Sequence, residues 1–474
     1  MSNKYDVIII GAGIGGLTCD TKLAKEGLKV LIIEKHDKVG GCVTACRKKG
    51  FNFDYGAHIF GSCNKNGILK YYLNELRVNA IDFVRLNPTE RFIFPDQTIG
   101  VPQSIDEYMD FLKNKYPDEA GKIEPFFSEV IKIARSFSSE TLLRRYKEMT
   151  FEQLLWRYFK NVHLMSILSA QFRYLGSTPV HLAATSTCLM MVSYLRDGTY
   201  YPRGGTQKFS DSIADKFKEY GGKTLLKNEA MKIIVKNKRV LGVKTKNGGT
   251  YESDIVISNG DAAKTFFSLI DRTEISQTYL ETIKKMRISS SFFMTFLGVK
   301  NDLELKNKNG WYHYSYGLDL KPDQSMYIFI PSLVDDSAAA KNHHVIELAM
   351  PFPYDFNNVK DWSSCKQELK DKLLNMATKV IPGLRRSIEF EESATPKTIE
   401  RYTYNAHGAA CGWEMSVDQV HNKRLAHKTP ITGLYLVGHW TNPGCGVAPV
   451  ATSGWIVADQ IIKERCHQYH EVKT

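Results

Sequence analysis

The chain has 474 residues, which is too long for one compact core, so two or three lobes are expected. Its residues are 43% hydrophobic and 24% charged, which is typical of a globular protein and not of a disordered one. The net charge of +12 indicates either a solvated basic surface or attraction to anionic lipid headgroups, whereas the dispersed Lys and Arg residues, without interleaved aromatics, argue against nucleic acid as a partner. The nine cysteines lack regular spacing, which predicts reduced thiols, no disulfide framework and no metal site.

The first predicted unit, residues 4–34, has the order strand, glycine-rich turn, helix, strand. An apolar run at 7–10 leads into the letters GAGIGG at 11–16, and a second apolar run at 30–33 ends in Glu34. Phosphates bound where such a helix begins face unpaired N–H groups and about half a positive charge. Glu34 stands where a carboxylate can accept hydrogen bonds from an adenosine ribose. The unit therefore predicts a dinucleotide-binding site.

The glycines of this turn have separate tasks. Gly11 allows the tight turn, Gly13 lets the backbone approach a pyrophosphate, and Gly16 lets helix and strand pack closely. No second fingerprint is found, because neither glycine pair, 204–205 or 248–249, lies between a buried strand and a helix. The sequence therefore predicts one dinucleotide site.

A second glycine-rich segment follows the predicted strand that ends in Glu34. The letters VGGCVT at 39–44 place Gly40 and Gly41 side by side, with the hydroxyl of Thr44 nearby. The letters GFNFDYGAHIFG at 50–61 then alternate aromatic and polar residues as a strand does, before the pattern breaks at glycine. Adjacent glycines alone are more often a simple turn, but here they indicate backbone brought close to a second part of the ligand.

These three segments resemble the start of the flavin-dependent oxidoreductases of the phytoene desaturase, carotenoid isomerase and retinol saturase family, a branch of the amine oxidase-like flavoproteins. The resemblance implies an α/β fold: a Rossmann-like, glutathione reductase-type FAD-binding domain with a discontinuous α+β substrate domain. With a single fingerprint, the resemblance implies FAD as the cofactor and an electron donor or acceptor supplied from outside. In that family the Gly-Gly segment runs along the diphosphate and ribityl chain of the flavin, which would place Gly40, Gly41 and Thr44 there. Many desaturases carry Arg where this chain has Cys42, so this position is nearer to the saturase and isomerase side.

Residues 65–195 are predicted to be mostly helical, because apolar residues recur at helical spacing over 68–76 and 126–133. A short hairpin is expected between them, at 91–102. Most of the Phe, Tyr, Leu and Met side chains here are expected to be packing core, and some are expected to line a long apolar tunnel.

Two segments bear on membranes and targeting. Residues 174–195 lack charged side chains over about the length of a spanning helix, but the letters GSTP at 176–179 predict two elements joined by a turn instead. The first strand begins by Asp6, so no signal or transit peptide is expected before it. The expected location is the cytoplasm, with peripheral contact at the inner face of the membrane where the basic surface meets anionic lipid.

The letters YPRGGTQK at 201–208 precede an amphipathic helix. This motif shares the family resemblance, which places it near flavin and substrate and makes Arg203 the candidate for a polar contact there; a loop Arg held by a carboxylate is the alternative. Strand-like runs over 225–245, the first at Leu225, predict a three-stranded meander. In flavoproteins of this type, the stretch that contains Met231 returns to the adenine side.

Residues 276–409 are predicted to form a sheet with a wide aromatic floor. Strand-like runs occur at 291–299, 326–330 and 344–350, and a long helix is expected at about 365–380.

The C-terminal segment is predicted to complete the cofactor site. A strand ends at Gly438 and His439, where family members usually have Gly-Asp, so the ribityl or phosphate contact made by that acid must differ here. Backbone amides of Gly446, Val447 and Ala448, where the last helix begins, can face the pyrimidine edge of the flavin and favour its anionic reduced form.

These units predict an FAD-binding domain formed by residues 1–64, 196–275 and 410–474, a helical, membrane-facing substrate lobe at 65–195 and a sheet-based substrate lobe at 276–409. The predicted cofactor contacts come from the fingerprint, the second glycine segment, the aromatic strand, the meander and the C-terminal segment: Gly11, Gly13, Ile14, Gly15, Gly16, Glu34, Lys35, Gly40, Gly41, Thr44, His58, Ile59, Met231, Gly438, His439, Gly446, Val447 and Ala448.

Two classes of function remain open. The first is an FAD-dependent oxidoreductase that acts on carbon–carbon bonds of an apolar polyene or isoprenoid substrate by desaturation, saturation or cis–trans isomerisation. The second is a flavin-dependent amine oxidase with a small polar substrate. The apolar lobes, the basic surface and the segments that resemble the desaturase family favour the polyene or isoprenoid class. The direction of the reaction is not readable, because removal and delivery of hydride need the same geometry at the flavin.

Overall fold

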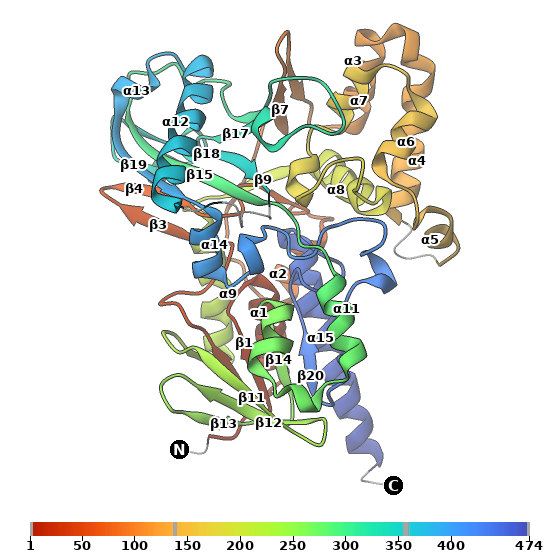
Figure 1. The fold of residues 1–474 in the computed structure, drawn as a ribbon, viewed down its shortest axis with the longest axis vertical. Coiled ribbons are helices and arrows are strands. Elements are labelled where there is room, and N and C mark those ends of the chain that lie inside the picture. Colours follow the sequence, from red (N-terminus) through yellow and green to blue (C-terminus); the bar gives the residue numbers. More distant parts are fainter. Residues whose placement is uncertain (1–2, 136–139, 354–358, 360, 472–474) are drawn as a thin grey trace.

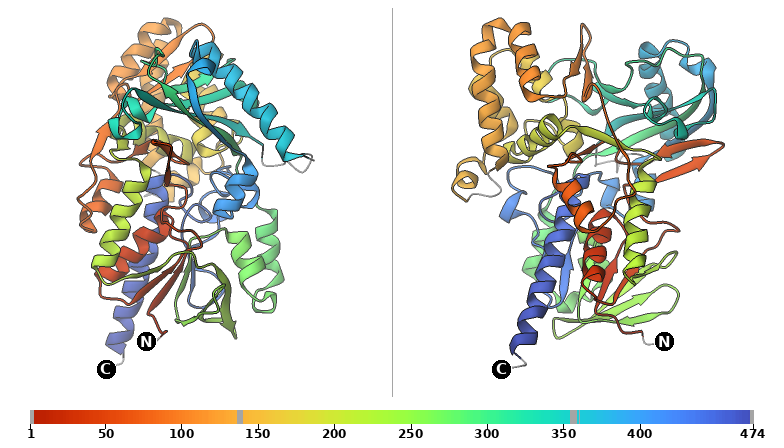
Figure 2. Two further views of the ribbon diagram at one scale, coloured as in Figure 1. Left: turned by 90° about the vertical axis from the view of Figure 1, so that its left-hand side faces the viewer. Right: turned by 180° about the vertical axis from the view of Figure 1, so that it is seen from behind.

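The computed structural model describes residues 3–135, 140–353, 359 and 361–471. A parallel sheet occupies the end of the molecule that carries both termini, and a large antiparallel sheet lies beside a group of helices at the opposite end (Figures 1 and 2). The chain passes between the two ends several times, so each end is built from segments that are far apart in the sequence.

The parallel sheet has the strand order β10-β2-β1-β14-β20. Its strands are β1 (Val7–Ile10), β2 (Val30–Ile33), β10 (Lys223–Leu225), β14 (Val256–Ser258) and β20 (Leu434–Leu436). Val7 and Ile9 of β1 pack with three helices on one face, α1 (Ile14–Lys25), α9 (Thr206–Glu219) and α15 (Val447–Glu471). Both faces are covered, which explains the unbroken apolar runs of these strands and confirms the α/β class expected from them.

A three-stranded meander covers the other face, with β11 (Ala230–Lys236), β12 (Arg239–Thr245) and β13 (Thr250–Glu252). The prediction that Leu225 begins this meander is wrong. Leu225 pairs with Ile33 of β2 in the parallel sheet, and the third meander strand is β13. An apolar pair of residues fits either sheet, and only the pairing partner decides between them.

The large sheet has seven strands in the order β19-β15-β18-β17-β16-β7-β8. They are β7 (Glu90–Ile93), β8 (Thr98–Val101), β15 (Ser291–Lys300), β16 (Gly310–His313), β17 (Ser325–Phe329), β18 (His343–Phe352) and β19 (Ile388–Ala394). The hairpin β7–β8 joins it through a parallel pairing of β7 with β16. The segment 65–195 and the segment 276–409 therefore share one sheet and one apolar core.

The helices beside this sheet are α3 (Ile105–Lys115), α4 (Ala120–Ala134), α5 (Glu140–Tyr146), α6 (Phe151–Tyr158), α7 (Val162–Leu168) and α8 (Ala184–Asp197). A short 3₁₀ helix (Phe172–Leu175) precedes α8, and Gly176 ends it in the left-handed conformation. The uncharged stretch before Leu195 thus forms two elements. Among the described residues, no helix combines the length and apolarity needed to cross a bilayer.

The remaining elements pack around the two sheets or connect them. The strands are β3 (Ala45–Lys48), β4 (Phe51–Asp54), β5 (Phe60–Gly61), β6 (Phe83–Arg85) and β9 (Thr199–Pro202). The helices are α2 (Ile68–Glu75), α10 (Ala262–Lys264), α11 (Gln277–Lys285), α12 (Trp362–Val380), α13 (Leu384–Ser387) and α14 (Pro396–Thr403).

Candidate cofactor site

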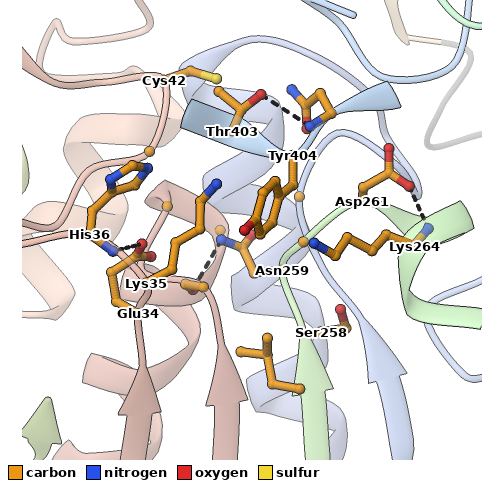
Figure 3. A pocket seen from close by; sticks show the side chains of 18 of the residues that line it. Glu34, Lys35, His36, Cys42, Ser258, Asn259, Asp261, Lys264, Thr403 and Tyr404 are labelled. Carbon is orange, nitrogen blue, oxygen red and sulfur yellow. Dashed lines mark hydrogen bonds between the residues drawn. The ribbon is translucent and has the colours of Figure 1, made fainter. Parts of the chain in front are cut away.

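A pocket lies where β1, β2 and β14 end and α1 begins (Figure 3). The carboxyl ends of parallel strands are the usual ligand site of α/β sheets. The wall is assembled from segments along the whole chain, namely residues 10, 11 and 13–15, 33–36, 40–43, 229–230, 258–261, 264–265, 269, 402–405, 438–439 and 450.

Two glycine-rich turns form the floor of the pocket. The amide of Gly40 donates to the carbonyl of Ala12 at 2.8 Å, which places the second glycine segment against the first. Gly41 has φ +60°, and a Cβ there would lie 3.1 Å from Cα of Gly13. Gly13 caps α1 without a side-chain hydrogen bond, and the first turn of α1 contains no acid. The amides at the start of α1 are therefore suited to an anionic group.

Glu34 is held rigidly beside this floor. Its Oε2 accepts from the amide of Ala12 at 2.7 Å, and its Oε1 accepts from the amide of His36 at 2.9 Å. Glu34 is buried. Each carboxylate oxygen has a further lone pair, so the fixed carboxylate can also accept from the hydroxyls of a ribose.

The opposite wall is an arrangement of two cations around one aromatic ring. The ring of Tyr404 lies between two ammonium groups (Figure 3). The Nζ atom of Lys35 is 3.1 Å from the ring centroid, and the Nζ atom of Lys264 is 3.0 Å from it. Burial lowers the pKa of Lys35 to about 8, a shift that Glu34 opposes. Two ammonium groups at the wall favour an anionic ligand such as a dinucleotide.

Asn259 fixes the turn from the side of β14. Its amide Nδ2 donates to the carbonyl of Gly11 at 3.2 Å. A Cβ on Gly13, Gly15 or Gly438 would lie 2.8 Å from an atom of the Asn259 side chain. The glycines thus leave room for this side chain as well as for a ligand.

Sequence reasoning assigned no pocket contact to the residues at the end of β14, at α10 and at the end of α14. These are Ser258, Asn259, Asp261, Lys264, Tyr402 and Tyr404. The apolar run at 255–257, just before Asn259, was the available signal in the sequence, and the structure pairs this strand with β1. No local signal marks Tyr404, whose left-handed backbone (φ +61°) ends α14.

Ten of the predicted contacts line the pocket: Gly11, Gly13, Ile14, Gly15, Glu34, Lys35, Gly40, Gly41, Gly438 and His439. His439 is partly buried, and the loss of solvent around its ring together with the charge of Arg424 lowers its pKa to about 3. It therefore stands at the pocket as a neutral imidazole. Gly16 lies behind the floor inside α1, where a Cβ would meet the carbonyl oxygen of Gly11 at 2.5 Å.

The remaining predicted contacts lie outside this lining. Thr44 donates to Oε1 of Gln207 at 2.6 Å, and Ile59 is part of the apolar core. Gly446, Val447 and Ala448 lie where α15 begins. Met231 on β11 is 49% exposed, and its neighbours Glu229 and Ala230 line the pocket instead.

His58 and Arg203 lie in different surroundings. His58 is partly buried with its Nε2 2.8 Å from Oε2 of Glu347, and the loss of solvent around the ring lowers the pKa of His58 to about 4. The exposed Arg203 pairs with Asp82, with Nε and Oδ2 2.6 Å apart. The structure thus gives Arg203 the carboxylate partner of the alternative interpretation, and it lies outside the pocket lining.

Comparison with known proteins identifies the family to which this chain belongs. Residues 14–462 match the family of flavin containing amine oxidoreductases. Prolycopene isomerase 1 of an Oncidium hybrid cultivar is 27% identical over 97% of this chain and 84% of its own length. Phytoene desaturase (neurosporene-forming) of Rhodobacter capsulatus is 27% identical over 96% and 93%, and human all-trans-retinol 13,14-reductase is 24% identical over 98% and 86%.

Solved structures share the fold. A putrescine oxidase variant superposes with a TM-score of 0.72 at 14% identity, over 97% of this chain and 99% of its own. An oxidoreductase from Methanosarcina mazei has a TM-score of 0.69 at 18% identity, over 96% and 100%. The glycine floor, the fixed Glu34 and the cationic wall fit a dinucleotide, and the cofactor is FAD. The chain belongs to the family of flavin containing amine oxidoreductases and is an FAD-dependent oxidoreductase.

Proposed function

We propose that this enzyme acts on carbon–carbon bonds of an apolar polyene or isoprenoid substrate by desaturation, saturation or cis–trans isomerisation, with an external electron donor or acceptor. The observation that carries the proposal is that relatives aligned over nearly the whole chain are a prolycopene isomerase, a phytoene desaturase and a retinol reductase. Amine oxidation is the alternative, and the putrescine oxidase that represents it shares the fold at only 14% identity.

An aromatic group beside the cofactor pocket supports an apolar substrate. The ring centroid of Tyr174 is 5.5 Å from that of Trp311, 5.9 Å from that of Tyr194 and 6.0 Å from that of Tyr327. The backbone carbonyl of Tyr174 accepts from the thiol of Cys411, in a loop next to the pocket. Stacked and edge-on rings give a polyene extensive apolar contact without requiring a polar group.

Glu90 brings one carboxyl group into this aromatic surrounding. It lies on β7, is buried, and accepts from Nε2 of Gln171 at 2.7 Å and from the hydroxyl of Tyr174. Burial raises the pKa of Glu90 to about 7. Bound FAD supplies the hydride acceptor or donor, and a carboxyl with this pKa can take up or release the accompanying proton. We therefore propose Glu90 as the proton carrier.

The test is turnover by the purified, FAD-loaded enzyme. Phytoene, prolycopene and all-trans-retinol are each supplied in detergent micelles under reducing and under oxidising conditions, and products are separated by chromatography. We expect a change in the number or geometry of conjugated double bonds with at least one of them. Hydrogen peroxide production from putrescine or another small amine, with every polyene unchanged, would contradict the proposal.

A surface on the helical group supports peripheral contact with anionic lipid. Trp156 on α6 is 51% exposed and is followed by the exposed Arg157, and the preceding helix α5 carries Arg144, which pairs with Glu140, and Arg145 (Figure 1). An exposed indole next to a cation is typical of a surface that lies in the headgroup region. We propose that this surface delivers apolar substrate from the bilayer.

Vesicle sedimentation tests this contact. We expect the holoenzyme to bind vesicles that contain anionic phospholipid, and Trp156→Ala with Arg157→Ser to weaken binding several-fold. Leu241→Ala is the matched control, because Leu241 is also exposed but lies on β12 at the other end of the molecule (Figure 1). Equal binding by all three proteins would contradict the proposed surface.

A further inference from the structure

Two cysteines from separate loops meet next to the cofactor pocket. Cys411 lies in the segment after α14 and Cys445 lies just before α15, and both are buried free thiols. Their Sγ atoms lie 3.3 Å and 3.9 Å from the same acceptor, the carbonyl oxygen of Tyr174, so both thiols meet at one backbone atom. The pairing is therefore a property of the fold that the spacing of the cysteines in the sequence does not reveal.

A buried cation faces this pair. The guanidinium of Arg424 donates to four backbone carbonyls, those of Thr441 at 3.0 Å, His439 at 2.6 Å, Trp413 at 3.2 Å and Glu414 at 3.4 Å. Within the described part of the chain it forms no ion pair with a carboxylate. A buried guanidinium without a counter-ion favours a negative charge nearby. The ionisable groups that face it are the imidazole of His439 and the two thiols, and of these only a thiol can become negative.

The two thiols are unequal. The neighbouring Cys411 and the charge of Arg424 lower the pKa of Cys445, whereas the neighbouring Cys445 and burial raise the pKa of Cys411. One thiol suited to ionise beside one that keeps its proton is the usual chemistry of a nucleophilic and a resolving cysteine. No group of three or more potential ligands in the described residues could hold a metal ion, so a metal site does not account for the pair.

The pair borders the flavin site. Gly412, next to Cys411, is packed so closely against His439 that an added Cβ would lie 2.9 Å from its ring, and His439 lines the pocket. Cys42 also lines the pocket and acts electrostatically on Cys411. The thiols thus lie between the pocket and the aromatic group around Tyr174.

We propose that Cys411 and Cys445 form a redox-active dithiol–disulfide couple that exchanges two electrons with the bound FAD. In the forward step an S–S bond forms between the two Sγ atoms, and the two electrons and two protons of the thiols go to FAD. The disulfide is reduced again by exchange with a thiol reductant of the glutathione or dithiol class, which leaves as its own disulfide. The couple would carry electrons between the bound FAD and the external thiol reductant. Its operation depends on FAD binding but not on the identity of the substrate.

Anaerobic reductive titration of the air-oxidised holoenzyme tests the couple. We expect the wild type to consume about twice as many electron equivalents per flavin as Cys445→Ser or Cys411→Ser, because the disulfide takes two electrons in addition to the two of FAD. Cys63→Ser is the matched control, since Cys63 is also buried and donates to a backbone carbonyl, that of Gly61 at 3.4 Å. It should behave as the wild type does.

Peptide mapping of the wild type keeps the proposal testable if the serine variants fail to fold. Oxidised protein is alkylated under denaturing conditions with and without prior reduction, and the Cys411 and Cys445 peptides are measured by mass spectrometry. We expect a linked peptide pair that separates on reduction. Full alkylation of both thiols in the oxidised protein, or equal electron uptake by the wild type and the variants, would overturn the proposal.

Discussion

Burial, more than residue type, sets the protonation of single side chains in this protein. Glu90 is an ordinary glutamate whose pKa rises to about 7 because the surrounding rings remove water, although two hydrogen bonds stabilise its charge. The pair His58 and Glu347 follows the same rule, since burial lowers the pKa of the imidazole and raises that of the carboxyl. Both residues can therefore be neutral at a separation of 2.8 Å.

Glu90 should make stability depend on pH. Its pKa is about 7 in the folded protein against an ordinary value of 4.5, so between these values the unfolded chain binds fewer protons and the free energy of unfolding falls as pH rises. The loss should reach about 3 kcal/mol above neutral pH. We expect Glu90→Gln to remove this part of the pH dependence in urea unfolding curves measured between pH 5 and pH 8. The exposed Glu107→Gln on α3 serves as control and should leave the wild-type slope unchanged.

At the scale of elements, the cofactor site depends on how closely α1 approaches β1. Gly16 lies in the first turns of α1, and an added Cβ would stand 2.5 Å from the carbonyl oxygen of Gly11 and 3.3 Å from the side chain of Ile9. The first of these contacts is with backbone, which cannot rotate away. The helix start and the glycine floor can therefore keep their positions only without a side chain here.

We expect Gly16→Ala to push α1 away from β1, to lower the melting temperature by several degrees and to weaken FAD binding by about tenfold or more, since the phosphate-facing amides move with the helix. Differential scanning fluorimetry and titration of apoprotein with FAD measure the two effects. Gly121→Ala is the control: Gly121 is in α4 with no atom within 4 Å of an added Cβ, so this change should be neutral or slightly stabilising. Wild-type affinity in Gly16→Ala would contradict the argument.

The elements that could be predicted from the sequence are those with a local signal. The fingerprint of α1, the run that became β15 and the long helix α12 were all visible from glycine placement or hydrophobic period. The strands with which these elements pair could not be predicted, because Leu225 and the hairpin β7–β8 carry patterns that suit more than one sheet. The wall around Tyr404 and the meeting of Cys411 with Cys445 depend on contacts between distant segments, which no period encodes.

Segments from along the whole chain meet at the cofactor pocket. Those around residues 34, 41, 259, 404 and 438 lie after β2, in the second glycine turn, and after β14, α14 and β20, and they converge on one site. The chain between them forms the large sheet and the helical group (Figure 1). A ligand that bridges these segments links the parallel sheet to the part of the chain that holds the aromatic group, so its binding energy adds to the stability of both ends.

FAD should therefore stabilise the chain far more than FMN does. FMN lacks the adenosine half that the fixed Glu34 and the ring of Tyr404 between its two lysines are suited to hold, whereas FAD reaches both the floor and the wall. At a concentration one hundred times Kd, FAD should add about 2.7 kcal/mol to the free energy of unfolding. Melting of the apoprotein with increasing FAD or FMN measures this, and Glu34→Gln should shrink the shift with FAD while the exposed Glu252→Gln on β13 should not. Equal shifts with the two flavins would show that the adenosine half is not bound in this pocket, because only the half they share would then contribute.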